Sequence, residues 1–201
     1  MVSIYHLKPW FQGKLRPATN YLARHGVTAN MVTMLAIVCS FAMGAALFYW
    51  HNHPHILYAM PAILFLRMAL NAIDGMLARE HNMQSKLGAI LNELGDILSD
   101  TALYLPLAFF PQFNCYLIVA IVILAALSET AGILGCQIGA RRRYDGPCGK
   151  SDRAAIFGIL CLVIAAQAPL GAYMNIIQSI IVVLLILTIF NRIYAALKEA
   201  P

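Results

Sequence analysis

Long apolar stretches alternate with short polar connections along most of the chain. Most of these stretches reach the roughly 20 residues that a helix needs to cross the hydrocarbon core of a membrane. The pattern predicts six membrane-spanning helices, at about residues 30–50, 56–79, 87–110, 115–140, 154–170 and 176–197. We therefore expect an all-α, polytopic membrane protein with a single domain over residues 1–201, in which residues 30–197 form a six-helix bundle.

Residues 1–29, ahead of the first span, mix basic side chains with aromatic and aliphatic ones. The basic residues are Lys8, Lys14, Arg16 and Arg24, and the apolar ones include Tyr5, Leu7, Trp10, Phe11, Leu15 and Tyr21. This mixture predicts an amphipathic helix that lies on the membrane surface. No cleavable signal peptide is expected, because the first apolar run begins late and is long enough to span.

The basic residues fall on one side of the predicted topology. Thirteen of the fourteen Lys and Arg residues lie in the amino-terminal segment, the second-to-third connection, the fourth-to-fifth connection and the carboxyl end. Such residues concentrate in cytoplasmic loops, so both termini are expected in the cytoplasm, and Arg141 to Arg143 are interpreted as part of this topology signal. The opposite side carries His51, His53 and His55, which suit either a metal site or a polar loop.

Composition agrees with a lipid solvent and limits the partners. Of the 201 residues, 61% are hydrophobic and 11% are charged, whereas a soluble domain carries roughly a quarter charged residues. The net charge of +5 does not indicate nucleic acid, because no basic cluster lies on a soluble fold. Membrane lipids, anionic headgroups or phosphorylated substrates are the expected partners.

Five of the nine acidic residues fall inside predicted spans, where a charge is costly and usually marks function. They are Asp74, Glu93, Asp96, Asp100 and Glu129. Asn71 and Asp74 share one face of the second span, while Asn92, Asp96 and Asp100 form a stripe along the third. The short connection makes these helices antiparallel neighbours, so the stripes can face each other. Carboxylate and amide oxygens suit Mg²⁺ or Mn²⁺.

A purely structural role for these acids is the alternative. They would then pair with each other or with Arg67, the one basic residue deep in a predicted span, and hold helices together. Because the acids outnumber Arg67, like charges in low dielectric favour a metal or shared protons. Glu129 in the fourth span is expected either to line the site or to pair with Arg67.

The acids belong to a longer pattern that resembles a known signature. The segment Asn71-Ala-Ile-Asp74-Gly75-Met-Leu-Ala78-Arg79 is followed, at set intervals, by Gly88, Asn92 and Asp96. It resembles the class I CDP-alcohol phosphotransferase signature, D-x2-D-G-x2-A-R-x8-G-x3-D-x3-D, at six of eight specified positions. The first span begins with Thr28-Ala-Asn30-Met-Val-Thr33, which is similar to the family's T-P-N-x-x-T.

The resemblance implies a reaction and a set of roles. An acceptor hydroxyl attacks the β-phosphorus of a CDP-alcohol, in this size class mostly CDP-diacylglycerol, and expels CMP in phospholipid biosynthesis. Asp96 matches the general base and Asp74 a metal ligand, and two divalent metals are usual. The positions that hold the cytidine diphosphate match Gly75, Ala78, Arg79 and Gly88. The family also implies homodimers, and we expect the inner membrane of a bacterium with a cytoplasmic active site.

Two aspartates of the signature are replaced by Asn71 and Asn92, which removes two negative charges from the metal site. One ion in place of two is therefore an open possibility. Glu93 or Asp100 would restore negative charge, and Arg67 would supply positive charge in place of a missing metal. Two other functions stay open, namely an inactive family member that binds lipid or CDP-nucleotide, and an ion or solute transporter.

The fourth-to-fifth connection offers cations on the side where the acids open. Gly149-Lys150-Ser151-Asp152-Arg153 stands at a helix entry, with Ser151 as the expected cap. Lys150, Ser151 and Arg153 are candidates to bind an acceptor phosphate, which favours a polyol phosphate such as glycerol 3-phosphate. Serine, inositol or a lipid headgroup is compatible with the same sequence.

Overall fold

The computed structural model describes residues 8–168 and 170–201, and every regular element in these ranges is a helix. Residues 1–7, which include Tyr5 and Leu7 of the expected interfacial segment, lie outside the described residues, as does residue 169. The α-helices are α1 (Lys8–Arg24), α2 (Ala29–Tyr49), α3 (Ala59–Glu80), α4 (Lys86–Tyr104), α5 (Cys115–Leu134), α6 (Lys150–Ala165) and α7 (Gly171–Glu199). Short 3-10 helices η2 (Pro54–Tyr58), η3 (Leu105–Phe109) and η4 (Gly135–Ile138) extend α3, α4 and α5.

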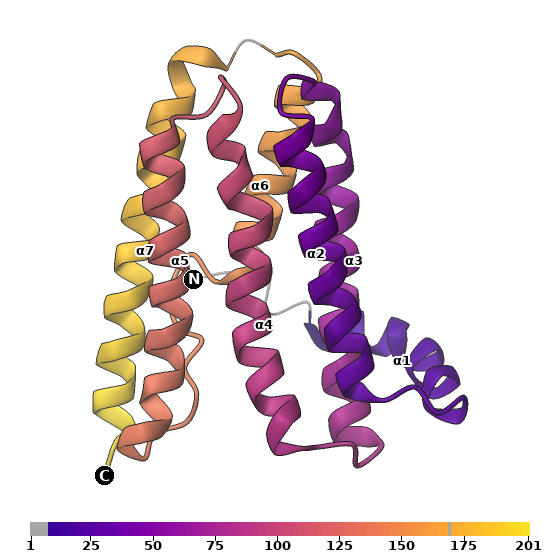
Figure 1. Cartoon of the computed structure of the whole chain (residues 1–201). Coiled ribbons are helices and arrows are strands. Elements are labelled where there is room, and N and C mark those ends of the chain that lie inside the picture. The colour runs from indigo at the N-terminus through magenta and orange to yellow at the C-terminus, as the bar shows by residue number, and fades with distance from the viewer. Residues whose placement is uncertain (1–7, 169) are drawn as a thin grey trace.

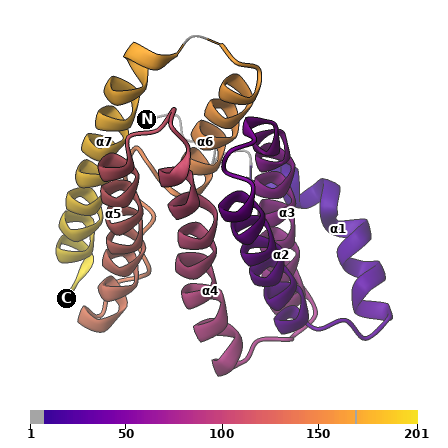
Figure 2. The same ribbon diagram turned by 45° about the horizontal axis from the view of Figure 1, so that its top comes forward.

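Helices α2 to α7 run side by side as a bundle, and each coincides with one of the six expected spans (Figures 1 and 2). Four described segments are long and apolar enough to cross a membrane, namely Ala29–Tyr49, Pro54–Glu80, Cys115–Ile138 and Tyr173–Glu199. Acidic residues interrupt the apolar sequence of α4, and α6 is only 16 residues long. The all-α fold is thus confirmed, and crossing by α4 and α6 stays a prediction.

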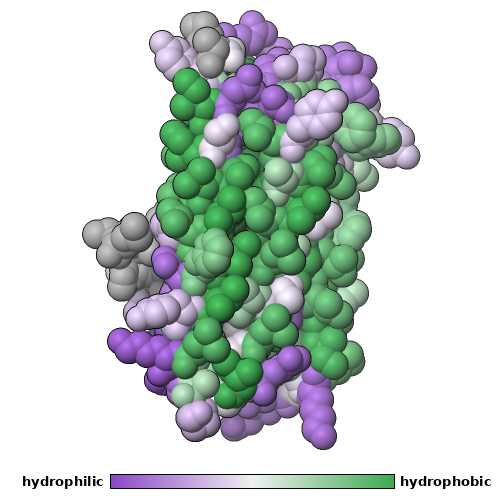
Figure 3. All heavy atoms as spheres, turned by 90° about the vertical axis from the view of Figure 1, so that its left-hand side faces the viewer, coloured by the Kyte–Doolittle hydropathy of each residue, from purple (hydrophilic) through white to green (hydrophobic). Residues whose placement is uncertain are grey.

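The outer surface carries the apolar band expected of an integral membrane protein. Figure 3 shows hydrophobic side chains covering the middle of one face, with hydrophilic residues gathered at its two ends. On α7 the exposed residues include Ile176, Ile180, Val183, Leu187 and Phe190, which repeat every three or four positions along one face of the helix. Lipid is the solvent that such a face requires.

Helix α1 leaves the bundle and runs across its direction (Figure 1). Its inner side is apolar, because Leu15 and Leu22 pack against a core formed by α2 and α3. Arg16 makes a two-pronged ion pair with Glu80 at the end of α3, at 2.9 and 3.0 Å. The helix expected in residues 1–29 therefore exists over 8–24, while its position on a membrane surface stays a prediction.

The segment between η4 and α6, residues 139–149, does not stay at the end of the bundle. It turns back along α5 and α7 before α6 begins (Figure 1). The Arg143 N–H donates to the Gly132 carbonyl of α5 at 3.0 Å, and the Cys148 N–H donates to the Thr188 hydroxyl of α7 at 3.0 Å. Gly146 has φ +121° and touches Thr188, a combination that excludes a side chain there. Buried non-helical backbone of this kind is tolerated in a membrane protein when protein surrounds it.

This re-entry moves the start of α6 and its capping. The helix begins at Lys150 after the N-cap Gly149, whose N–H donates to Asp152 Oδ2 at 3.0 Å. Ser151 lies inside the first turn, so the expectation that it caps the helix is wrong. The physical reason is that Asp152, three residues after Gly149, reaches back to the free N–H of the cap.

Candidate active site

The signature residues of α3 and α4 meet, because the two helices are antiparallel and joined by a five-residue connection, 81–85. The Asn71 side-chain amide donates to Asp96 Oδ1 at 3.1 Å. The two polar stripes expected from the sequence therefore face each other at this point. Asn92 is half-buried one turn before Asp96 on α4.

Asp74 lies in a buried position that α2 helps to form. Its carboxylate is 4% exposed and accepts a hydrogen bond of 2.7 Å from the Thr33 hydroxyl. Thr33 is the last residue of the motif that opens the first span. One hydrogen bond thus joins the motif that opens the first span to the signature on α3. Thr33 is a site residue that the sequence interpretation did not assign.

Asp96 is contacted by two cations from different helices. The Lys150 ammonium, from the first turn of α6, donates to Asp96 Oδ1. The Arg67 guanidinium donates to the Asp96 backbone carbonyl at 3.0 Å and lies 3.7 Å from its carboxylate. Lys150 was expected beside an acceptor phosphate, and the structure places it beside the residue that matches the general base.

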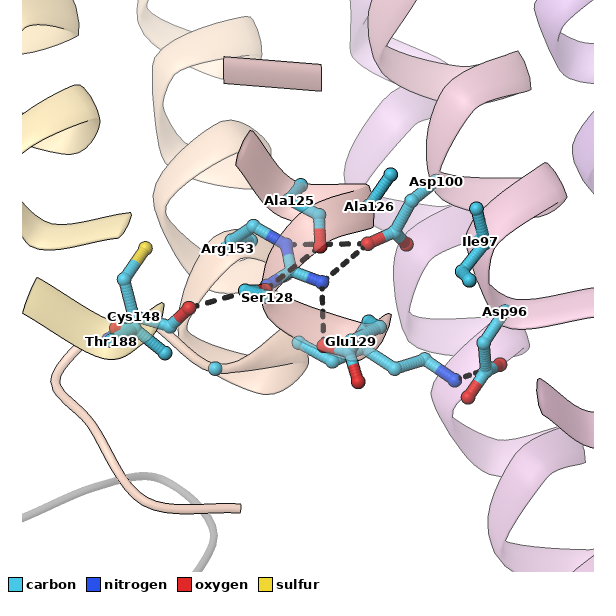
Figure 4. Close-up of polar contacts among 12 residues, drawn as sticks. Asp96, Ile97, Asp100, Ala125, Ala126, Ser128, Glu129, Cys148, Arg153 and Thr188 are labelled. Carbon is cyan, nitrogen blue, oxygen red and sulfur yellow. Dashed lines mark hydrogen bonds and ion pairs between the residues drawn. The ribbon is translucent and has the colours of Figure 1, made fainter. Parts of the chain in front are cut away.

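Deeper in the bundle, Asp100 and Glu129 are paired with buried arginines, of which Figure 4 shows Arg153. Arg153 of α6 is fully buried and donates to Asp100 at 2.6 Å, to Glu129 at 3.1 Å and to the Cys148 carbonyl at 3.2 Å. Arg67 pairs with the other Asp100 oxygen. Because both Asp100 oxygens are bound, Asp100 is a partner of these arginines instead of a replacement metal ligand, and the donors of Arg153 are directed at protein groups.

The expectation that Arg67 is the one cation deep in the bundle is wrong. Arg192 of α7 is 2% exposed and lies 3.4 Å from Glu129, which it shares with Arg153. The sequence interpretation counted Arg192 among the basic residues of the cytoplasmic carboxyl end, because the basic residues lie on one side of the predicted topology. No ion pair joins Glu129 to Arg67 among the described residues, so of the two roles considered for Glu129 the pairing with Arg67 is not the one observed.

Arg142 contradicts the interpretation of Arg141 to Arg143 as topology signals alone. Its guanidinium pairs with Glu93 of α4 at 2.6 Å and reaches Glu129 of α5 at 3.4 Å. The Tyr144 ring stacks against the same group, 4.4 Å from its centroid. Residues 139–149 re-enter the bundle, and this brings Arg142 to carboxylates that sequence spacing alone cannot place beside it.

The glycine positions of the signature have two different surroundings. The Arg79 guanidinium folds back over Gly75, within 3.1 Å of where a Cβ would lie. A Cβ on Gly88 would lie 2.6 Å from the Asn30 side-chain oxygen and 2.9 Å from the Ser85 hydroxyl, so a side chain there would displace these two groups. Ala78 is half-buried on the same turn of α3 as Arg79.

The donor set of the signature suits a divalent cation. Its carboxylates are Asp74 and Asp96, and Asn71 and Asn92 offer only neutral amide oxygens. Two dications would place four positive charges against these two carboxylates, so the diphosphate of a bound donor would have to supply the remaining negative charge. Among the described residues, no three His, Cys, Asp or Glu side chains lie together as a metal cluster, either at His51, His53 and His55 or at the signature. One ion held by two carboxylates and completed by substrate phosphates is the usual Mg²⁺ arrangement.

No nucleophilic thiol serves this region. Cys148 is the cysteine nearest the site in the chain, and burial raises the pKa of its thiol to about 11. At neutral pH the group is a protonated thiol, and the thiolate is the reactive form. Covalent catalysis by cysteine is therefore not indicated.

Comparison with known proteins decides the family. A model of the CDP-alcohol phosphatidyltransferase family matches residues 26–190. The chain belongs to this family. The chain is also 45% identical over 191 residues to the inner membrane protein YnbA of Escherichia coli, covering 95% of this chain and 94% of that one. The resemblance recognised from the signature residues is confirmed.

Solved structures of one family member have the same fold. The phosphatidylinositol phosphate synthase of Mycobacterium tuberculosis with CDP-DAG bound is similar with a TM-score of 0.72 and 20% identity, over 90% of this chain and 92% of that one. The same synthase in complex with manganese and citrate gives a TM-score of 0.73, also at 20% identity, over 92% and 89%. This likeness establishes the arrangement of helices.

Proposed function

We propose that this protein transfers a phosphatidyl group from CDP-diacylglycerol to the hydroxyl of an alcohol, with release of CMP. The observation that carries the proposal is the contact of Asn71 with Asp96, 3.1 Å, which joins the two halves of the signature across α3 and α4. Binding of CDP-DAG by the similar M. tuberculosis synthase supports the choice of donor. The inner membrane relative from E. coli supports a bacterial inner membrane. We place the site on the cytoplasmic side because the basic residues gather on that side of the predicted topology.

The reaction that this site would perform is a single displacement at phosphorus. The acceptor oxygen forms a bond to the β-phosphorus, and the bond from that phosphorus to the bridging oxygen breaks, so CMP leaves with the electron pair. Asp96 accepts the proton of the attacking hydroxyl. Such a general base typically contributes about 10²- to 10⁴-fold to the rate.

The donor would be held at the ends of α3 and α4. Arg79 is exposed beside Gly75, where its guanidinium can bind the diphosphate in a two-pronged manner. Ala78 and Gly88 place no bulky side chain on the neighbouring surface, so that the nucleotide can approach the backbone. The acyl chains would remain in the lipid that surrounds the bundle.

One Mg²⁺ or Mn²⁺ ion would be held by Asp74 and Asp96, with Asn71 or Asn92 adding an amide oxygen. Such an ion neutralises charge on the diphosphate and on the departing CMP. Manganese in the similar synthase supports a divalent cation. Thr33 holds Asp74 in one orientation, and Asn71 does the same for Asp96.

The test is release of CMP by the purified protein in lipid nanodiscs, supplied with CDP-diacylglycerol, Mg²⁺ or Mn²⁺ and a panel of alcohols. Acceptor-dependent release that falls at least about 100-fold in Asp96→Asn supports the proposal. Asp145→Asn is the matched control, because Asp145 pairs with Arg143 in the connection and is not part of the signature.

Binding of CDP separates the remaining alternatives. An inactive family member would bind CDP and release no CMP with any alcohol. A protein that binds no CDP while it remains well folded would contradict the assignment of Gly75, Ala78, Arg79 and Gly88, and would favour a transporter. The homodimer expected for the family is checked by the mass of the same nanodisc preparation.

A further inference from the structure

The charged groups around Asp96 form two tiers that differ in access. Side chains of the accessible tier are 15% to 24% exposed, and those of the buried tier 7% or less. The accessible tier consists of Glu93, Asp96, Arg142 and Lys150. The buried tier consists of Arg67, Asp100, Glu129, Arg153 and Arg192. An acceptor from water meets the accessible tier.

In the accessible tier, each cation is already held by a carboxylate. Arg142 pairs with Glu93 at 2.6 Å, and Lys150 pairs with Asp96. Two cations and two carboxylates sum to no net charge. The accessible tier as a whole is therefore neutral, in spite of the chain's overall charge of +5, and Arg67 of the buried tier adds a cation 3.7 Å from the Asp96 carboxylate.

A phosphorylated acceptor needs something different. A phosphate monoester brings about 1.5 to 2 negative charges at neutral pH, and proteins bind it with Arg or Lys donors that are free to turn toward it. Here the phosphate would have to displace Glu93 from Arg142, and the displaced carboxylate would remain beside it. Glu93 and Asp96 are three residues apart on α4 and share a face, so both carboxylates would repel the phosphate of the acceptor.

Lys150 is the only cation of the two tiers that could become free for a phosphate. A metal ion at Asp96 would release at most the Lys150 ammonium, which leaves Glu93 and Arg142 paired. In the buried tier, Arg153 is fully buried and bound by Asp100, Glu129 and the Cys148 carbonyl.

We propose that the acceptor is an alcohol that carries no phosphate group, and that Glu93 is the residue that determines this specificity by occupying Arg142. The inference rests on the proposed transferase function and narrows its acceptor. It departs from the polyol phosphate that Lys150, Ser151 and Arg153 suggested from the sequence.

The experiment compares matched pairs of acceptors in nanodiscs with CDP-diacylglycerol, namely inositol with inositol 1-phosphate and glycerol with glycerol 3-phosphate. The expected result is a kcat/KM at least about tenfold higher for one unphosphorylated alcohol than for its phosphorylated partner. Glu93→Gln removes the nearer of the two carboxylates that pair with Arg142, leaving Glu129 at 3.4 Å, and is expected to raise kcat/KM for the phosphorylated partner about tenfold. Glu199→Gln is the matched control, because it releases Arg141, which is not among the charged groups around Asp96, while Arg143 keeps its pair with Asp145.

A second readout does not depend on turnover. Broadening of the ³¹P signal of glycerol 3-phosphate, with CDP present, reports its binding directly. It is expected in Glu93→Gln and absent in the unchanged protein and in Glu199→Gln. Preference of the unchanged protein for a phosphorylated acceptor, or its binding of glycerol 3-phosphate as tightly as Glu93→Gln does, overturns the inference and leaves the transferase standing. Loss of CDP binding in folded, unchanged protein contradicts the transferase itself.

Discussion

The Thr33 hydroxyl donates a hydrogen bond of 2.7 Å to Asp74 across 41 residues of chain. This contact fixes the carboxylate that we assign to the divalent cation. Partners of this kind typically change metal affinity by about 10- to 100-fold. Thr33→Val is therefore expected to weaken Mn²⁺ binding by about 10- to 100-fold, measured by electron paramagnetic resonance with CDP present.

Two control variants isolate the hydroxyl. Thr33→Ser keeps the donor and is expected to retain the affinity for Mn²⁺. Thr130→Val removes an exposed hydroxyl that donates only to its own helix, at 2.9 Å to Ala126, and is expected to change nothing. If Thr33→Val binds Mn²⁺ as the unchanged protein does, Thr33 has no positioning role.

Metal stoichiometry follows from the two amides of the signature. The unchanged protein is expected to bind one Mn²⁺ per chain in the presence of CDP, because Asp74 and Asp96 are the only carboxylates that the signature retains. The double variant Asn71→Asp with Asn92→Asp adds two charges and is expected to bind a second ion. Titration calorimetry gives both numbers, and two ions in the unchanged protein would show that neutral amides suffice.

Arg153 is expected to dominate the stability of this half of the bundle. Arg153→Met removes the donor that Asp100 and Glu129 share, although Arg67 and Arg192 keep their own contacts with these acids, and loss of one partner of a buried pair costs up to about 3–5 kcal/mol. Arg141→Met removes an ion pair whose arginine side chain is 90% exposed, so its cost is about 0.5 kcal/mol or less. Unfolding of both variants by SDS in mixed micelles measures the difference. Equal midpoints would mean that the buried network adds little.

The orientation of the bundle is testable with cysteines already present. Cys115 and Cys136 are exposed near opposite ends of the segment formed by α5 and η4, while Cys148 and Cys161 are buried. A membrane-impermeant maleimide is expected to reach Cys136 from the cytoplasmic side and Cys115 from the other. Cys148, whose pKa of about 11 keeps it a thiol at pH 7.4, is expected to react only after unfolding. The reverse labelling pattern would contradict the predicted orientation and favour the opposite one.

Much of the fold was accessible from sequence because apolar run length and the chemistry of lipid leave few choices. A run of about 20 apolar residues has no stable state in a bilayer other than a helix, and a short connection makes its neighbour antiparallel. The same logic placed Asn71 opposite Asp96. Element ends differed by a few residues, as for α6, which begins at Lys150, four residues before the expected span.

The charge partners were harder to foresee, because pairing depends on how deep a segment lies. By sequence position, Arg142 and Arg192 are counted among the basic residues of the cytoplasmic side. Hydropathy does not predict that residues 139–149 turn back into the bundle. The local signals of this turn are Gly146, which permits the close approach to Thr188, and the carboxylates left without partners on α4 and α5. An excess of acids in the spans was visible from the sequence, and it called for cations from outside the spans.

The placement of Arg153 bears on how the chain is assembled during synthesis. Its partners Asp100 and Glu129 belong to α4 and α5, which leave the ribosome before α6. A lone α6 would bring a bare guanidinium into hydrocarbon, which the bilayer resists. When α6 emerges, however, both carboxylates have already been synthesised, and pairing lowers the cost of burying the arginine and the carboxylates alike. The second half of the bundle is thus expected to enter the membrane as a cooperative unit, with α6 retained at the translocation channel until α4 and α5 accept it.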